Sequence, residues 1–170
     1  MGVAVMARPR VPSSGLLWRV ASGRQRLPYR YPEIIDGFTA LLEQHRAYRQ
    51  AVQELPADPP HELWCATATA DGQAETRIAA VVDDIDRMVA ARIAQSPPPP
   101  AVGPVPIHPE SIGQIYSRIA HLWLREPGSI DQPRTCTLLA VLVAYDELRT
   151  DLACGARRLP TPRPPPQERG

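Results

Sequence analysis

The sequence predicts an all-α protein, a single bundle of four to five helices with a disordered N-terminal arm, a proline-rich linker and a disordered proline-rich tail. Apolar residues recur at helical spacing in four segments, and we find no run of alternating apolar and polar residues typical of a half-buried strand. The 21 prolines cluster between and after those segments, where they end helices because proline lacks a backbone N–H donor. A length of 170 residues suffices for one domain with a substantial core.

Two helices are expected in the first part of the bundle. The first runs over about 33–55, and its apolar face consists of Ile34, Phe38, Leu41, Leu42 and His45. The second covers roughly 61–95, and the stripe in its latter half consists of Ile78, Val82, Ile85, Val89 and Ile93. Because glycine is a poor helix former, we expect Gly72 in the stretch ADGQ to kink or divide this second helix.

Two more helices are expected after the proline-rich linker. The third begins in HPESIGQIYSRIAHLW (108–123), with an apolar face of Ile112, Ile115, Ile119 and Leu122. The fourth spans about 133–154, with a stripe of Leu138, Val141, Tyr145, Leu148 and Leu152, and Gly155 follows as a left-handed C-terminal residue. Since Leu139, Leu142 and Val143 make the fourth helix apolar around much of its circumference, we expect it to be central or to meet a second protomer.

These patterns divide the chain into a basic arm, a domain and a tail. Residues 1–32 hold six arginines and no acidic residue, and we expect them to form a disordered arm. Residues 33–158 form the helical bundle domain, which the linker at 96–107 (rich in proline) interrupts. Residues 159–170 (LPTPRPPPQERG) form a proline-rich tail that cannot build a core.

Composition argues against nucleic acid and membranes as partners, and it suggests a cytoplasmic, bacterial protein. The net charge is +1 and only 5% of residues are aromatic, so nucleic-acid binding has little support. No apolar run approaches the ~20 residues that span a bilayer, so we expect no membrane insertion. Three cysteines without metal-ligand or disulfide spacing fit reduced, part-buried thiols in a cytoplasmic protein. The chain has no Lys and no Asn, as a GC-rich genome, most simply an actinobacterial one, would encode.

The start of the third helix holds the first candidate site. Pro109 fits the first helical position, Glu110 the first turn and His108 the cap position, although histidine is not a preferred cap. This explains Pro109 and Glu110 as a helix start and leaves His108 unexplained. The alternative is that His108 and Glu110 are catalytic residues, acting as a base or as metal ligands.

Candidate residues also lie elsewhere on the second and third helices. Asp86 lies at the edge of an apolar stripe, where a carboxylate either forms an ion pair or joins His108 and Glu110 in catalysis. Asp83, three residues away, is its neighbour on the helix, a pair that could also start a divalent-ion site. Arg118 and His121 belong to a mildly cationic stripe that either faces solvent or binds an anionic ligand. We identify no metal-binding set of His and Cys residues, and no motif that specifies a cofactor.

The second half of the chain resembles a family of small actinobacterial helical proteins defined as a domain of unknown function. The matching positions are Ile85-Asp86-Arg87, His108, Glu110, Ser111, Gly113, Arg118, Tyr145-Asp146 and 155–160 (GARRLP). The resemblance covers roughly 36–160 and implies a helical fold and a bacterial cytosolic setting, but no reaction. Two positions depart from the family pattern: Pro109 stands where a Thr is usual, and Ser117 where an acid is expected.

Two functions are therefore open. The favoured one is a non-catalytic accessory protein that binds a protein partner or a second copy of itself through helix faces, because no group of residues assembles a reaction mechanism. It predicts an exposed apolar patch on the last helix and no deep polar pocket. The alternative is a small enzyme or ligand-binding protein, in which His108, Glu110 and Asp86 converge on one concave pocket, with Arg118 beside them.

Overall fold

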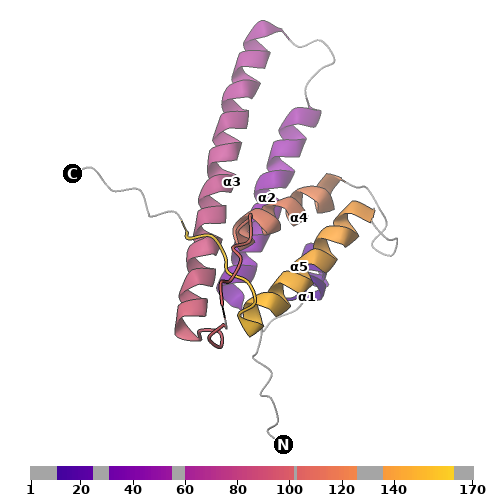
Figure 1. Ribbon diagram of the computed structural model, residues 1–170. Helices are drawn as coiled ribbons and strands as arrows, with labels where there is room; N and C mark the ends of the chain where they lie inside the picture. The colour runs from indigo at the N-terminus through magenta and orange to yellow at the C-terminus, as the bar shows by residue number, and fades with distance from the viewer. Residues whose placement is uncertain (1–10, 25–30, 55–59, 102, 126–135, 163–170) are drawn as a thin grey trace, which may run out of the picture.

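The computed structural model describes residues 11–24, 31–54, 60–101, 103–125 and 136–162, and the regular elements of these ranges are all helices (Figure 1). They are α1 (Ser14–Ala21), α2 (Pro32–Gln53), α3 (His61–Gln95), α4 (Ile112–Arg125) and α5 (Cys136–Cys154). The prediction of an all-α bundle is confirmed. In the described residues, no helix is long and apolar enough to cross a membrane.

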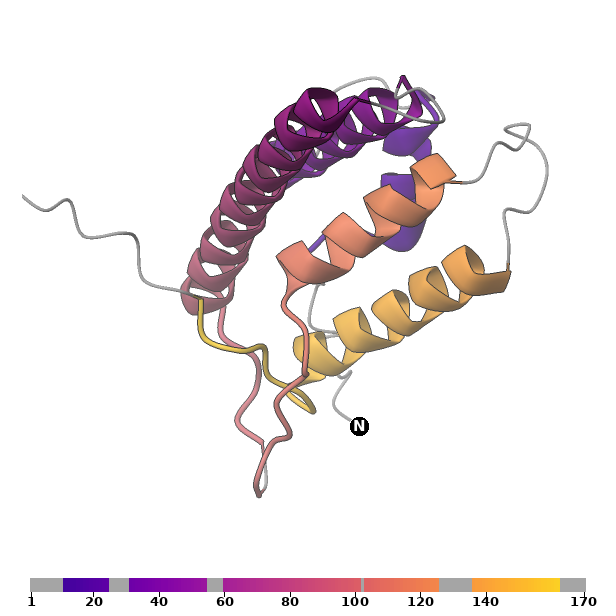
Figure 2. The same ribbon diagram turned by 90° about the horizontal axis from the view of Figure 1, so that it is seen from above.

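The helices form three layers, with α4 in the middle (Figure 2). The two longest helices, α2 and α3, pack side by side as a hairpin, and α4 lies against both of them. On its other side α4 contacts α5, while α1 fills the corner between α2 and α5. The expectation that the last helix is central is therefore wrong, because α4 takes that place and α5 forms an outer layer.

The predicted apolar stripes face the core. All five predicted positions of α2 are buried, as are Ile85 and Val89 of α3. As the middle layer, α4 buries a wider face than the sequence pattern suggested, adding Tyr116, Ala120 and Trp123 to the predicted isoleucines. In α5 the buried residues are Leu138, Leu142, Tyr145, Leu148, Leu152 and Ala153.

The second predicted helix is not divided at Gly72, because α3 runs unbroken from His61 to Gln95. One glycine inside a helix costs only about 1 kcal/mol relative to alanine. Breaking α3 there would cost more, since the half-buried Asp71 and Ala74 on either side of Gly72 line a shared hollow with α2. The packing of α3 along α2 therefore overrides the local preference.

The expectation of a disordered arm is wrong for residues 11–24, while 1–10 and 25–30 lie outside the described residues. Val11 and Leu17 are buried in the core. Ser13 caps α1, since its hydroxyl accepts a hydrogen bond from the Leu16 amide at 3.3 Å. The segment contributes apolar surface that the bundle buries, so it belongs to the domain.

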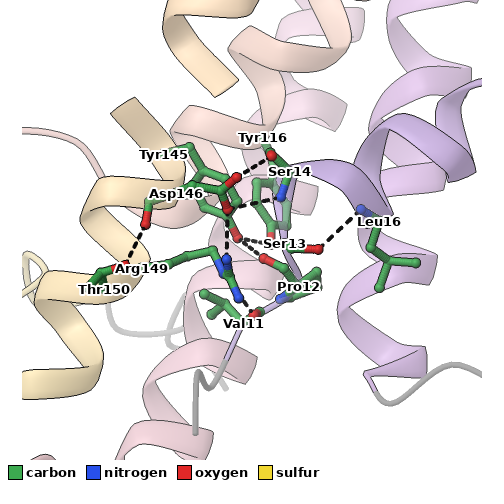
Figure 3. Close-up of polar contacts among 10 residues, drawn as sticks. All are labelled: Val11, Pro12, Ser13, Ser14, Leu16, Tyr116, Tyr145, Asp146, Arg149 and Thr150. Carbon is green, nitrogen blue, oxygen red and sulfur yellow. Dashed lines mark hydrogen bonds and ion pairs between the residues drawn. The ribbon is translucent and has the colours of Figure 1, made fainter. Parts of the chain in front are cut away.

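A polar cluster holds this N-terminal segment against α4 and α5 (Figure 3). The Tyr145 hydroxyl donates to the Pro12 carbonyl at 2.7 Å and lies 2.8 Å from the Tyr116 hydroxyl. The Asp146 carboxylate accepts from the Ser14 amide and hydroxyl, and the Arg149 guanidinium donates to it at 2.7 Å. Burial alone would raise the pKa of Asp146, but these hydrogen bonds outweigh it and hold the pKa below its ordinary value.

The linker and the beginning of the tail run alongside each other. The His108 amide donates to the Arg158 carbonyl at 2.8 Å, and the Arg158 amide donates to the Pro106 carbonyl at 3.0 Å. Gly155 has the predicted left-handed conformation, with φ of +77°. Leu159 packs against the core, so the expected tail begins as part of the fold, and 163–170 lie outside the described residues.

Candidate functional site

The third predicted helix begins later than expected. Pro109 is not its first residue, because α4 starts at Ile112 and Ser111 caps it. The Ser111 hydroxyl accepts from the Gln114 amide at 3.2 Å, and the Gln114 side chain accepts from the Ser111 amide at 2.8 Å. This reciprocal pair is a capping box, and its Ser-x-x-Gln spacing was readable in the sequence.

His108 and Glu110 point away from a common centre. The Nδ1 atom of His108 faces its own loop, 3.1 Å from the Glu110 amide and 2.8 Å from the Glu110 carbonyl. The Glu110 carboxylate instead accepts from the Arg118 guanidinium at 2.7 Å. These two predicted catalytic residues thus organise the loop before α4 and one surface ion pair.

Asp86 of α3 contacts the beginning of α4 through its side chain. Its carboxylate accepts from the Gly113 amide at 2.8 Å, so it satisfies a first-turn N–H of a helix that is distant in sequence. Burial raises the pKa of Asp86, and the nearby Asp83 raises it further, while hydrogen bonds from Ser111 and Gly113 oppose that rise. The contact brings the backbones so close that a side chain at Gly113 would meet the Val82 carbonyl oxygen at 2.5 Å.

A groove of about 980 Å³ opens beside this junction, between α2, α3, the start of α4 and the end of the described chain. Asp86 and His121 line it, whereas His108, Glu110 and Arg118 do not. The structure therefore brings together one predicted catalytic residue and one predicted ligand-binding residue. Other residues of its lining are His45, Tyr48, Glu75, Ile78, Ala79, Val82, Asp83, Ser111 and Gln114.

His45 is a functional candidate that we did not identify from the sequence, where it counted only as part of an apolar face. It is buried, its Nε2 lies 2.9 Å from the Ser117 hydroxyl, and its ring meets the His121 ring edge-on at 5.6 Å between centroids. Burial is the main cause that lowers the pKa of His45 to about 4, and the charge of His121 also lowers it. Its place in the apolar stripe of α2 was itself a signal, since an ionisable group there must be desolvated.

The groove has an acidic lining that includes an apolar strip. Glu75, Asp83 and Asp86 supply carboxylates, His45 is neutral at pH 7, and no arginine is among the described lining residues. Ile78, Ala79 and Val82 form an apolar strip of α3 between these groups. Within the described part of the chain, no three His, Cys, Asp or Glu side chains lie close enough to hold a metal ion. The arrangement suits a ligand that is cationic at its ends and apolar between them.

A second hollow of about 530 Å³ lies on the other side of the segment 160–162. The C-terminal end of α3, the prolines 97–100 and the segment 155–162 surround it. Both hollows include Asp86, Ser111 and residues 160–162 in their linings, so this segment lies at their boundary.

Comparison with known proteins adds no relative: no family model, no curated protein and no solved structure matches this chain.

Proposed function

We propose that this protein is a non-catalytic cytoplasmic binding protein, and that its groove binds a primary ammonium group. The observation that carries the proposal is the acidic lining of Glu75, Asp83 and Asp86 beside an apolar strip. An ammonium ion gains from nearby carboxylates, and an attached alkyl chain gains by covering apolar surface. The three cysteine thiols are exposed, so the expectation that they are part-buried is wrong, and free thiols fit a reducing compartment.

A binding role fits the lining better than catalysis does. Of the three predicted catalytic residues only Asp86 lines the groove, and its carboxylate is already engaged by the start of α4. Glu75 and Asp83 of α3 both line the groove, where their carboxylates can attract a cation. The ammonium group belongs either to a free amine or to a lysine of a partner protein.

Titration calorimetry with hexane-1,6-diamine tests the proposal, with hexane-1,6-diol as the uncharged ligand of the same length. We expect the diamine to bind and the diol to bind at least tenfold more weakly. Glu75→Gln and Asp83→Asn should each weaken diamine binding roughly two- to fivefold, the scale of one solvent-exposed charge pair. Glu43→Gln removes an exposed carboxylate of α2 that does not line the groove, and it should change nothing.

The source of the ammonium group is distinguished by a second ligand, the peptide acetyl-Gly-Lys-Gly-Lys-Gly-amide. Tighter binding of the peptide would indicate a protein partner, and tighter binding of the diamine would indicate a free amine. Equal affinity for diamine and diol, or variants in the groove that bind the diamine as wild type does, would refute the proposed function.

A further inference from the structure

The outward face of α5 is apolar and lacks a neighbour among the described helices. Leu139 is 41% exposed and Val143 is 60% exposed. The first ten residues of α5, 136–145, include no charged residue. As Figure 2 shows, α5 is the outer layer of the bundle, with α4 on its inner side. The predicted apolar patch on the last helix is thus present.

The exposed residues follow the spacing of a helix–helix contact. Cys136, Ala140, Val143 and Glu147 are all exposed and are separated by four, three and four residues. That rhythm places them in one line along the helix, here called the outer seam, as in a pair of packed helices. The buried stripe of Leu138, Tyr145 and Leu148 lies on the side that faces the core. The outer seam therefore has the pattern of a second, unused packing face.

We infer that the outer seam binds the outer seam of a second copy of this chain, with the two α5 helices antiparallel about a two-fold axis. In the register that pairs Ala140 with the partner's Val143, the small residue of each helix meets the larger one of the other. The same register places Glu147 beside the partner's Cys136, in the first turn of its helix. Backbone N–H groups there have no partner within the helix and favour a negative charge.

Charge complementarity favours a second copy in this orientation. The first turn of α5 has no acidic residue of its own, so Glu147 of the other copy supplies the charge that this helix end favours. The two-fold axis makes the contact twice, once at each end of an uncharged centre. A parallel pair would instead place the two Glu147 carboxylates side by side, where they repel each other.

The outer seam shares no residue with the groove, so self-association and amine binding are tested separately. Sedimentation equilibrium of the full chain under reducing conditions should show a reversible dimer. Val143→Glu should raise the dimer dissociation constant at least tenfold, because it places a charge in the centre of the contact. Leu63→Glu, at an apolar residue of α3 that is 40% exposed, is the control for adding a charge elsewhere and should leave the constant unchanged.

Cross-linking tests the orientation. In a Cys65→Ser, Cys154→Ser background, Glu147→Cys places a thiol opposite the partner's Cys136, so mild oxidation should yield a disulfide-linked dimer, and adding Cys136→Ser should abolish it. A cross-link that survives Cys136→Ser would overturn the antiparallel register. A wild-type chain that stays monomeric at 100 µM or more, or a Val143→Glu dimer as tight as wild type, would overturn the proposal itself.

Discussion

His45 should make the stability of the protein fall as the solution becomes mildly acidic. The folded protein holds this side chain neutral, with a pKa of about 4 instead of 6.5. In the unfolded chain the same ring binds a proton near pH 6.5. Because the unfolded state then binds more protons, lowering the pH through this window favours unfolding.

The size of the effect follows from the two pKa values. His45 contributes no pH dependence above about pH 7.5, where it is neutral in both states, and none much below pH 4, where it is charged in both. Between those limits, each pH unit is equivalent to about 1.4 kcal/mol. At pH 5 the loss reaches about 2 kcal/mol, and over the whole window it approaches about 3 kcal/mol.

Urea unfolding of wild type and of His45→Gln between pH 8 and pH 4.5 measures this loss. Glutamine can still hydrogen-bond the Ser117 hydroxyl but does not titrate, so the unfolding free energy of the variant should decline less steeply with falling pH. At pH 8 we expect the variant to be less stable than wild type. His61→Gln, at an exposed residue of α3, is the control for losing a histidine and should parallel wild type. If the unfolding free energies of wild type and His45→Gln decline in parallel from pH 7 to pH 5, His45 is not held neutral and the reasoning fails. Asp86, whose pKa is raised above its ordinary value, acts with the opposite sign, because lowering the pH through its raised pKa favours the folded state.

Four further substitutions test how the helices are joined. Gly113→Ala should destabilise the fold by about 1–3 kcal/mol in urea titrations, because the added methyl group meets backbone atoms of Val82, which cannot move away by a side-chain rotation. Ser111→Ala should lower the unfolding free energy by about 1 kcal/mol through loss of the cap, whereas His108→Ala should cost less than half of that in the same assay. Asp146→Asn should loosen α1, measured as faster amide hydrogen exchange in residues 14–21, and the wild-type stability due to Asp146 should be lost as pH falls below the ordinary carboxyl range.

Periodicity was enough to predict four of the five helices, because each buries one face against a neighbour. The stripe from Ile34 to His45 and the stripe from Ile112 to Ile119 are core positions in the structure. We did not predict helix α1 from the sequence, because its eight residues are too few to show a repeating apolar stripe. Arg19 and Arg24 also suggested a basic arm. Its Ser13 cap was visible in the sequence, but the partners that hold it, Tyr145 and Asp146, lie more than 130 residues away.

The candidate site was less predictable because it depends on contacts between distant segments. The sequence shows that Asp86 sits at the edge of an apolar stripe, but not that its carboxylate reaches the first turn of α4. His108 and Glu110 drew attention as neighbours in the chain, yet the loop before α4 turns them toward Arg118 and toward their own backbone. His45 was counted as a core residue, and burial is also what shifts its pKa.

The position of α4 explains why the two proposed binding surfaces lie apart. A helix packed between two layers buries residues on nearly opposite sides, as Gly113 and Ile115 do, and has little surface left for a ligand. Polar residues of α4 reach solvent at the edges of the layer, where His121 enters the groove. Binding surfaces must then be built largely on the outer layers: the groove on α2 and α3, the outer seam on α5. Occupancy of one would leave the other open, so a dimer should still bind one amine per copy, which calorimetry on wild type and Val143→Glu would show as equal stoichiometry.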